Sequence, residues 1–166
     1  MSSLVLSRQN YGYATLANIP SHLIRQLQSV MNAAALMIYS TSRYDQISPL
    51  LSQLHWLKAR ERIDFKLAVL VFKCLNGTAP AYLADELSHP SDFVNRRRLR
   101  SASSSRLIVR RTRLSTYGDR AFSVAGPRVW NSLPHHVTSA PSVSVFKSRI
   151  KTFLFSRSFS NISNFV

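Results

Sequence analysis

KARERIDFKLAVLVFKCLNG, residues 58–77, carries the clearest structural signal in this chain. The stretch has no proline, and its apolar residues recur at three- and four-residue steps, which is typical of a helix with a buried face. A second apolar face near its end predicts that this helix, from about Lys58 to Asn76, is central to the molecule. Gly77 is suited to the left-handed conformation that closes a helix.

Weaker helix signals lie on both sides of this segment. A capping residue or a proline at the first helical position indicates a helix start at four points, Ser21, Ser48-Pro49, Pro80 and Ser142. Two short runs, Leu107–Val109 and Phe122–Val124, allow a minor β-hairpin without requiring it. Gly126-Pro127 indicates a turn. We therefore expect a mainly α fold, a small bundle of four to five helices with room for that hairpin and with a basic flexible arm.

Composition divides the chain into segments. Residues 1–18 carry no clear period, 19–89 predict a helical subdomain, and 90–106 form a Ser/Arg-rich linker. Residues 107–158 predict a small α/β subdomain and 159–166 a disordered tail. The apolar pattern assigns the following residues to the core: Leu27, Leu54, Trp56, Ile63, Leu67, Leu70, Val71, Phe72, Trp130, Phe146 and Ile150.

The charge balance points to a polyanionic partner. Lys plus Arg number 22 and Asp plus Glu number 7, a net charge of +15. Such an excess favours nucleic acid through counterion release, and anionic membranes by the same Coulomb attraction. The densest cluster predicts the contact residues: Arg96, Arg97, Arg98, Arg100, Arg106, Arg110, Arg111 and Arg113. A generic basic surface or a nuclear-import signal is an equally good interpretation of this cluster.

Several function classes find no support in the residues. Cys74 is the single cysteine, which excludes an intrachain disulfide. The chain has neither the apolar start of a signal peptide nor a run of about 18 apolar residues. We expect an intracellular protein, nuclear or cytoplasmic, that is neither secreted nor membrane-spanning.

Catalytic chemistry is equally unsupported. Asp85-Glu86, His135-His136 and Cys74 are the residues that could suggest it. Neighbouring acids on a helix point to different sides, two histidines do not complete a zinc site, and a packed thiol is usually inert. We expect no catalytic residue, no metal, no cofactor, no small-molecule substrate and no membrane partner.

Four stretches, taken in order, resemble the region that follows the polymerase palm in LINE-type (non-LTR) retrotransposon reverse transcriptases of the jockey superfamily. They are LANIP with LIRQLQSVMNAAA (residues 16–35), YDQISPLLSQLHWLKARERIDFKLAVLVFKCLNGTAPAYLADEL (44–87), RRTRLSTYGDRAFSVAGPRVWNSLP (110–134) and SVSVFKSRIKTFLF (142–155). The joint order over roughly 140 residues is far more specific than one short motif. Lys58 stands where the family often has proline.

The resemblance implies the thumb and post-thumb region of an RNA-directed DNA polymerase, with residues 19–89 thumb-like. Its partner would be RNA or DNA, a template–primer duplex by analogy. The family's catalytic aspartates match no position here, so we expect a fragment without the catalytic palm, not an enzyme by itself, that at most binds nucleic acid. The alternative is a protein-interaction or structural helical module in which the apolar face from Ile63 to Cys74 docks a partner.

Overall fold

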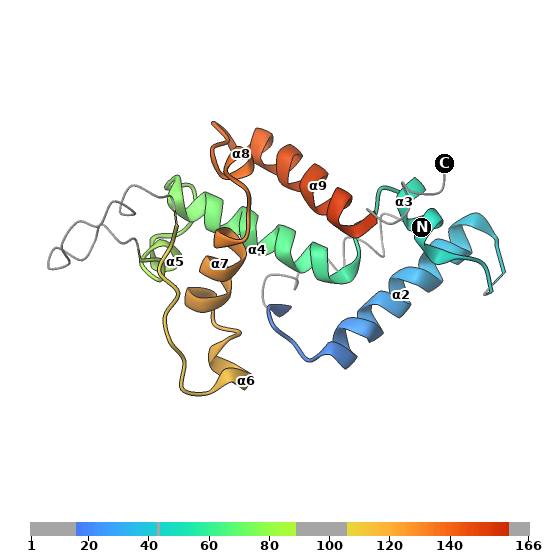
Figure 1. The fold of residues 1–166 in the computed structure, drawn as a ribbon, viewed down its shortest axis with the longest axis horizontal. Helices are drawn as coiled ribbons and strands as arrows, with labels where there is room; N and C mark the ends of the chain where they lie inside the picture. The colour runs from blue at the N-terminus through green and yellow to red at the C-terminus, as the bar shows by residue number, and fades with distance from the viewer. Residues whose placement is uncertain (1–15, 43, 89–105, 160–166) are drawn as a thin grey trace, which may run out of the picture.

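The computed structural model of the chain describes residues 16–42, 44–88 and 106–159, and within these ranges the protein is mainly helical (Figure 1). The expected fold class is confirmed. The helical segments are more numerous than the four to five expected because several are single turns. They are α2 (Ser21–Tyr39), α3 (Ile47–Gln53), α4 (Ala59–Leu75), α5 (Ala81–Ala84), α6 (Ser115–Gly118), α7 (Phe122–Asn131), α8 (His135–Thr138) and α9 (Val143–Phe159).

Helix α4 is the central element of the fold. It packs against α7 and α9, and α2 also contacts it (Figure 1). Its apolar residues are buried on more than one side, among them Ile63, Leu67 and Phe72. Gly77 has φ +64°, and the Thr78 N–H donates to the Lys73 carbonyl at 2.9 Å. This is the left-handed helix closure expected from the sequence.

Three aromatic rings hold α4, α7 and α9 together. Phe72 and Phe146 stack with centroids 4.3 Å apart, and Trp130 lies 5.9 Å from Phe146. These rings belong to the largest core cluster, which also takes in Leu57 and Leu107. The core is therefore built from chain segments on both sides of residues 89–105, so the two predicted subdomains share it.

A second cluster lies at the other end of α4. Met31 from α2, Leu51 from α3 and Trp56 from the following corner meet there with Phe159, the last residue of α9. The prediction of a disordered tail from residue 159 is wrong at Phe159, which is 6% exposed because it closes this cluster. Residues 160–166 lie outside the described ranges.

Most of the residues assigned to the core are buried. Leu27, Leu54 and Leu70 are half-buried, and the first two pack against the second cluster. The buried ones are Trp56, Ile63, Leu67, Val71, Phe72, Trp130, Phe146 and Ile150.

The β-hairpin and the Gly126-Pro127 turn are corrected by the structure. No strand occurs in the described part of residues 107–158, so that segment is helical rather than α/β, and Phe122–Val124 begin helix α7. Gly126 and Pro127 lie inside α7 and are buried. A Cβ on Gly126 would come 3.0 Å from Val71 Cγ2. The glycine thus allows α7 to approach α4 closely, and burial of the proline ring offsets the missing helical hydrogen bond.

The helix starts follow the sequence only in part. Ser142 Oγ accepts the Val145 N–H at 3.4 Å, as expected for the cap of α9. Ser21 is instead the first residue of α2 after Pro20, and Ser48 lies inside α3, where Gln46 precedes the helix. Pro49 still falls in the first turn, where its missing N–H removes no helical bond. None of the described helices is both long enough and apolar enough to cross a bilayer.

Candidate nucleic-acid interface

The predicted arginine cluster divides between described and undescribed residues. Arg96, Arg97, Arg98 and Arg100 lie outside the described ranges, as does most of the expected basic arm. Arg106, Arg110, Arg111 and Arg113 are described, and all four are exposed. They lie on an extended segment, residues 106–113, which we call the arginine strap and which runs from the α5 side of the molecule past α7 to α6 (Figure 1).

The strap is attached to the core at Leu107. This side chain is 3% exposed and belongs to the largest core cluster. The Leu107 N–H donates to Asn131 Oδ1 at 2.9 Å, and Asn131 Nδ2 donates to the Leu107 carbonyl at 2.8 Å. The Ile108 N–H donates to the Ser88 carbonyl at 3.0 Å. Because Asn131 satisfies the donor and the acceptor of Leu107, the strap is extended without a partner strand.

Asp119, the acidic residue closest in sequence to the strap among the described residues, already pairs with Arg128 and Thr112. Asp119 receives the Thr112 hydroxyl at 2.7 Å and two contacts from the Arg128 guanidinium, at 3.0 and 3.1 Å. The hydrogen bond from Arg128, followed by that from Thr112, holds the pKa of Asp119 below its ordinary value. The negative charge of Asp119 is therefore committed to Arg128 rather than to the strap arginines.

A second group of basic side chains lies where α4 and α9 pack together. Arg62, Lys66 and Lys73 fall on one face of α4, since they are separated by four and seven residues. Burial lowers the pKa of Lys66, and the positive charges of Arg62, Lys147 and Lys73 lower it further. Lys147 of α9 therefore lies close enough to the α4 cations for mutual repulsion.

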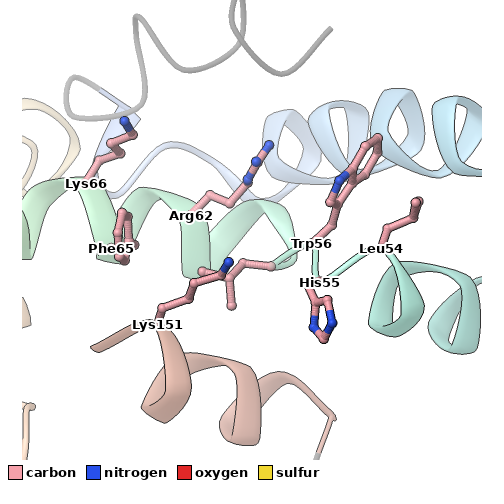
Figure 2. Close-up of a pocket in the computed structure, with 8 residues that line it drawn as sticks. Leu54, His55, Trp56, Arg62, Phe65, Lys66 and Lys151 are labelled. Carbon is pink, nitrogen blue, oxygen red and sulfur yellow. The ribbon is translucent and has the colours of Figure 1, made fainter. Parts of the chain in front are cut away.

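Part of this set lines a recess of about 400 Å³ between the corner before α4 and helix α9. Figure 2 shows Arg62, Phe65 and Lys66 extending from α4, Lys151 from α9, and Trp56 and His55 from the corner. We call this the cationic recess. Its lining residues are Leu54, His55, Trp56, Leu57, Arg62, Phe65, Lys66 and Lys151. This lining has three basic side chains, Arg62, Lys66 and Lys151, and no carboxylate.

The acidic residues of α4 pair away from the recess lining. Asp64 accepts a hydrogen bond from Arg157 Nη2 of α9, and Glu61 lies 4.0 Å from the same nitrogen. Arg157 thus partly neutralises two carboxylates that would otherwise offset the cations of α4. An exposed pair of this kind adds little to folding stability, but it concentrates positive charge on the other face.

The residues considered for catalysis do not form a site. Cys74 is buried and burial raises the pKa of its thiol, which disfavours the reactive thiolate. His135 and His136 are exposed on α8, and Asp85 and Glu86 are exposed after α5. In the described ranges, no three or more His, Cys, Asp or Glu side chains gather closely enough to hold a metal ion.

Sequence reasoning identified the strap arginines but not the recess. The local sequence pattern does not bring the lysines of α4 and those of α9 together. One signal could have connected them: all five lysines of the chain, Lys58, Lys66, Lys73, Lys147 and Lys151, belong to α4, its N-terminal cap or α9. Comparisons of the chain with protein-family models, curated proteins and solved structures found no match.

Proposed function

We propose that this chain is the thumb and post-thumb part of a LINE-type reverse transcriptase and that it binds RNA or DNA without performing polymerase chemistry itself. The ordered resemblance of four stretches supports the assignment to this family. The net charge of +15 supports nucleic acid as the partner. In this proposal the polymerase active site belongs to a palm domain that this sequence does not resemble.

The observation that carries the binding proposal is the arginine strap. Four exposed guanidinium groups lie on a segment whose backbone is held by Asn131 and Ser88. The planar fork of arginine matches phosphate oxygens, and a backbone already ordered loses less entropy on binding than a free one. The strap therefore has both the chemistry and the ordering that a phosphate backbone requires.

Three carboxylates of the described residues pair with arginines, which favours a binding role over a polymerase role. Two-metal nucleotidyl transfer needs acidic side chains that converge on the metal ions. Here Asp64 and Glu61 face Arg157, while Asp119 pairs with Arg128. These carboxylates form ion pairs between different elements of the fold and do not converge on one point.

Burial weighs against the alternative of a docking module. The face proposed for that partner, from Ile63 to Cys74, is covered inside the chain by α2, α7 and α9. Exposed apolar side chains occur elsewhere, on α2, where Val30 is 50% and Met37 is 70% exposed. A protein partner would therefore have to use an exposed apolar surface such as that of α2, not the face that the sequence suggested.

The binding proposal is tested by fluorescence anisotropy with a 20-nucleotide RNA and a DNA of the same sequence over a salt series. The double variant Arg111→Gln/Arg113→Gln should bind more weakly, and its plot of log K against log salt should be shallower by roughly 0.7–0.9 per lost phosphate contact. The matched control is Arg25→Gln/Arg60→Gln, which removes two exposed arginines outside the strap.

The control distinguishes binding at the strap from a general effect of net charge on affinity. Equal losses in the two double variants would show that the strap has no special role. If the unaltered protein binds neither RNA nor DNA at low salt, the proposed function is wrong.

A further inference from the structure

The cationic recess has two kinds of wall. Lys66 and Arg62 of α4 and Lys151 of α9 supply positive charge, while Leu54, Leu57 and Phe65 supply apolar surface. Trp56, 6% exposed, also contributes to the lining. Its volume of about 400 Å³ falls within the range of about 300–1,000 Å³ in which proteins commonly hold small ligands.

We infer that this recess holds the phosphate group of an unpaired nucleotide, with its sugar or base against the apolar wall. The inference rests on the proposed function and deepens it, because it assigns single-stranded nucleic acid to a site separate from the arginine strap. The strap lies beside α5 and α7, whereas the recess lies at the junction of α4, α9 and the corner after α3 (Figures 1 and 2).

The basic side chains of the lining, Arg62, Lys66 and Lys151, are the reason for expecting an anion. Burial lowers the pKa of Lys66, and the positive charge of Arg62 in the same lining lowers it further, as do Lys147 and Lys73 outside the lining. A bound phosphate would reverse this effect, since an anion between cations stabilises their charged forms. Lysine is a compact point charge that commonly binds phosphate, so the residue type fits the ligand.

The apolar wall is the reason for expecting an unpaired nucleotide rather than a duplex. In a duplex the bases are stacked inside, and a protein meets mainly phosphates and sugars. An unpaired nucleotide can turn its sugar or base toward apolar and aromatic side chains while its phosphate meets the cations. Phe65 and the exposed ring of His55, which lies 5.7 Å from the Phe155 ring, are placed for such contacts.

Lysine-selective NMR tests the recess directly. The chain has five lysines, so ¹³C,¹⁵N-lysine labelling yields five side-chain signals that single Lys→Gln variants assign. The 166-residue protein is titrated with thymidine monophosphate and, separately, with inorganic phosphate. We expect the Lys66 and Lys151 signals to shift and saturate together, with smaller changes at Lys58, whose Nζ lies 5.4 Å above the Phe159 ring.

The two small ligands separate a nucleotide site from a general anion site. Tighter binding of thymidine monophosphate than of phosphate supports a contribution from the apolar wall. Equal affinity overturns the nucleotide assignment. Parallel, non-saturating shifts of all five lysines overturn the site itself.

A second measurement compares strands. Lys66→Gln/Lys151→Gln should reduce the affinity for a single-stranded ten-nucleotide thymidine oligomer about tenfold and flatten its salt dependence by about 0.7 for each lysine that contacts a phosphate. The loss for a hairpin duplex should be clearly smaller. Arg25→Gln/Arg60→Gln, outside both the recess and the strap, is the control of equal charge. The strap variant Arg111→Gln/Arg113→Gln is measured alongside, and a thermal unfolding curve shows whether each variant folds.

The outcomes distinguish this inference from the proposed function. If the strap variant loses affinity and the recess variant does not, the recess assignment is wrong while nucleic-acid binding stands. If the recess variant loses equal affinity for single strand and duplex, the preference for an unpaired nucleotide is wrong. Saturable binding of thymidine monophosphate without any binding of oligomers would support the recess and contradict the proposed function.

Discussion

At the level of single residues, Asn131 holds the arginine strap against α7. Its amide group binds both the N–H and the carbonyl of Leu107, which a neighbouring strand would otherwise do. One side chain at the end of α7 thereby holds an extended segment against the core. The strap arginines are displayed on either side of that attachment.

Asn131→Ala should lower the free energy of unfolding by about 1–3 kcal/mol, because two backbone groups at a partly buried position lose their partners. Urea denaturation measures this loss, and amide exchange at Leu107 should become faster. The control is Ser132→Ala, which removes only an exposed hydroxyl that donates to the Val129 carbonyl. Equal behaviour of the two variants would show that Asn131 does not hold the strap.

Between elements, the junction of α6 and α7 depends on Asp119. Its carboxylate joins Thr112, at the end of the strap, to Arg128 of α7, and its carbonyl accepts Asn18 Nδ2 at 2.6 Å. The junction therefore links the strap and α7 to Asn18, which is distant in the sequence. Its strength depends on the ionised form of one carboxyl group.

This dependence predicts an acid-sensitive contribution to stability. The pKa of Asp119 is lowered from 3.8 in the folded protein, so the ionised form stabilises the fold at pH values above about 3.8. That contribution is lost as the pH falls through the lower, folded-state pKa. Asp119→Asn should therefore reduce the melting temperature at pH 7 and make little difference at pH 2.

The pH series is measured by thermal unfolding at intervals between pH 7 and pH 2. Asp85→Asn, at an exposed carboxylate after α5, is the control and should leave the melting temperature nearly unchanged throughout. A gap between the unaltered protein and Asp119→Asn that widens toward acid pH would contradict this account.

For the whole molecule, one aromatic cluster joins α4, α7 and α9. Phe146 of α9 is fully buried and contacts Phe72 of α4 and Trp130 of α7. Since the cluster joins segments on both sides of residues 89–105, the helices should unfold together. A small domain has only about 5–15 kcal/mol of net stability, so a loss at this cluster affects the entire chain.

Phe146→Ala should destabilise the fold by about 3–5 kcal/mol, through lost burial and a cavity among three helices. Phe146→Leu should cost less, because it fills more of the space. Tyr82→Ala is the aromatic control, since Tyr82 is 70% exposed. Urea denaturation followed by circular dichroism and by tryptophan fluorescence should give one shared transition; two separate transitions would show that the subdomains unfold independently.

How far the sequence predicted the fold can be seen along α4. The positions of the helix, its buried faces and the left-handed Gly77 all follow from local pattern, because helical periodicity and the conformational freedom of glycine act within a few residues. The same local reasoning failed at Gly126-Pro127. There the close approach of Val71 and the burial of the proline favour helix over turn, and both arise from contacts distant in the chain.

The candidate sites divide in the same way. The sequence by itself determined the excess of positive charge, the helical class and the identity of the strap arginines, since these are properties of composition and of neighbouring residues. Only the tertiary structure decided that Asn131 holds the strap, that Arg157 occupies the acids of α4, and that Lys66 and Lys151 line one recess. The physical reason is that a helix pattern shows which face is buried, whereas helix packing determines which faces meet.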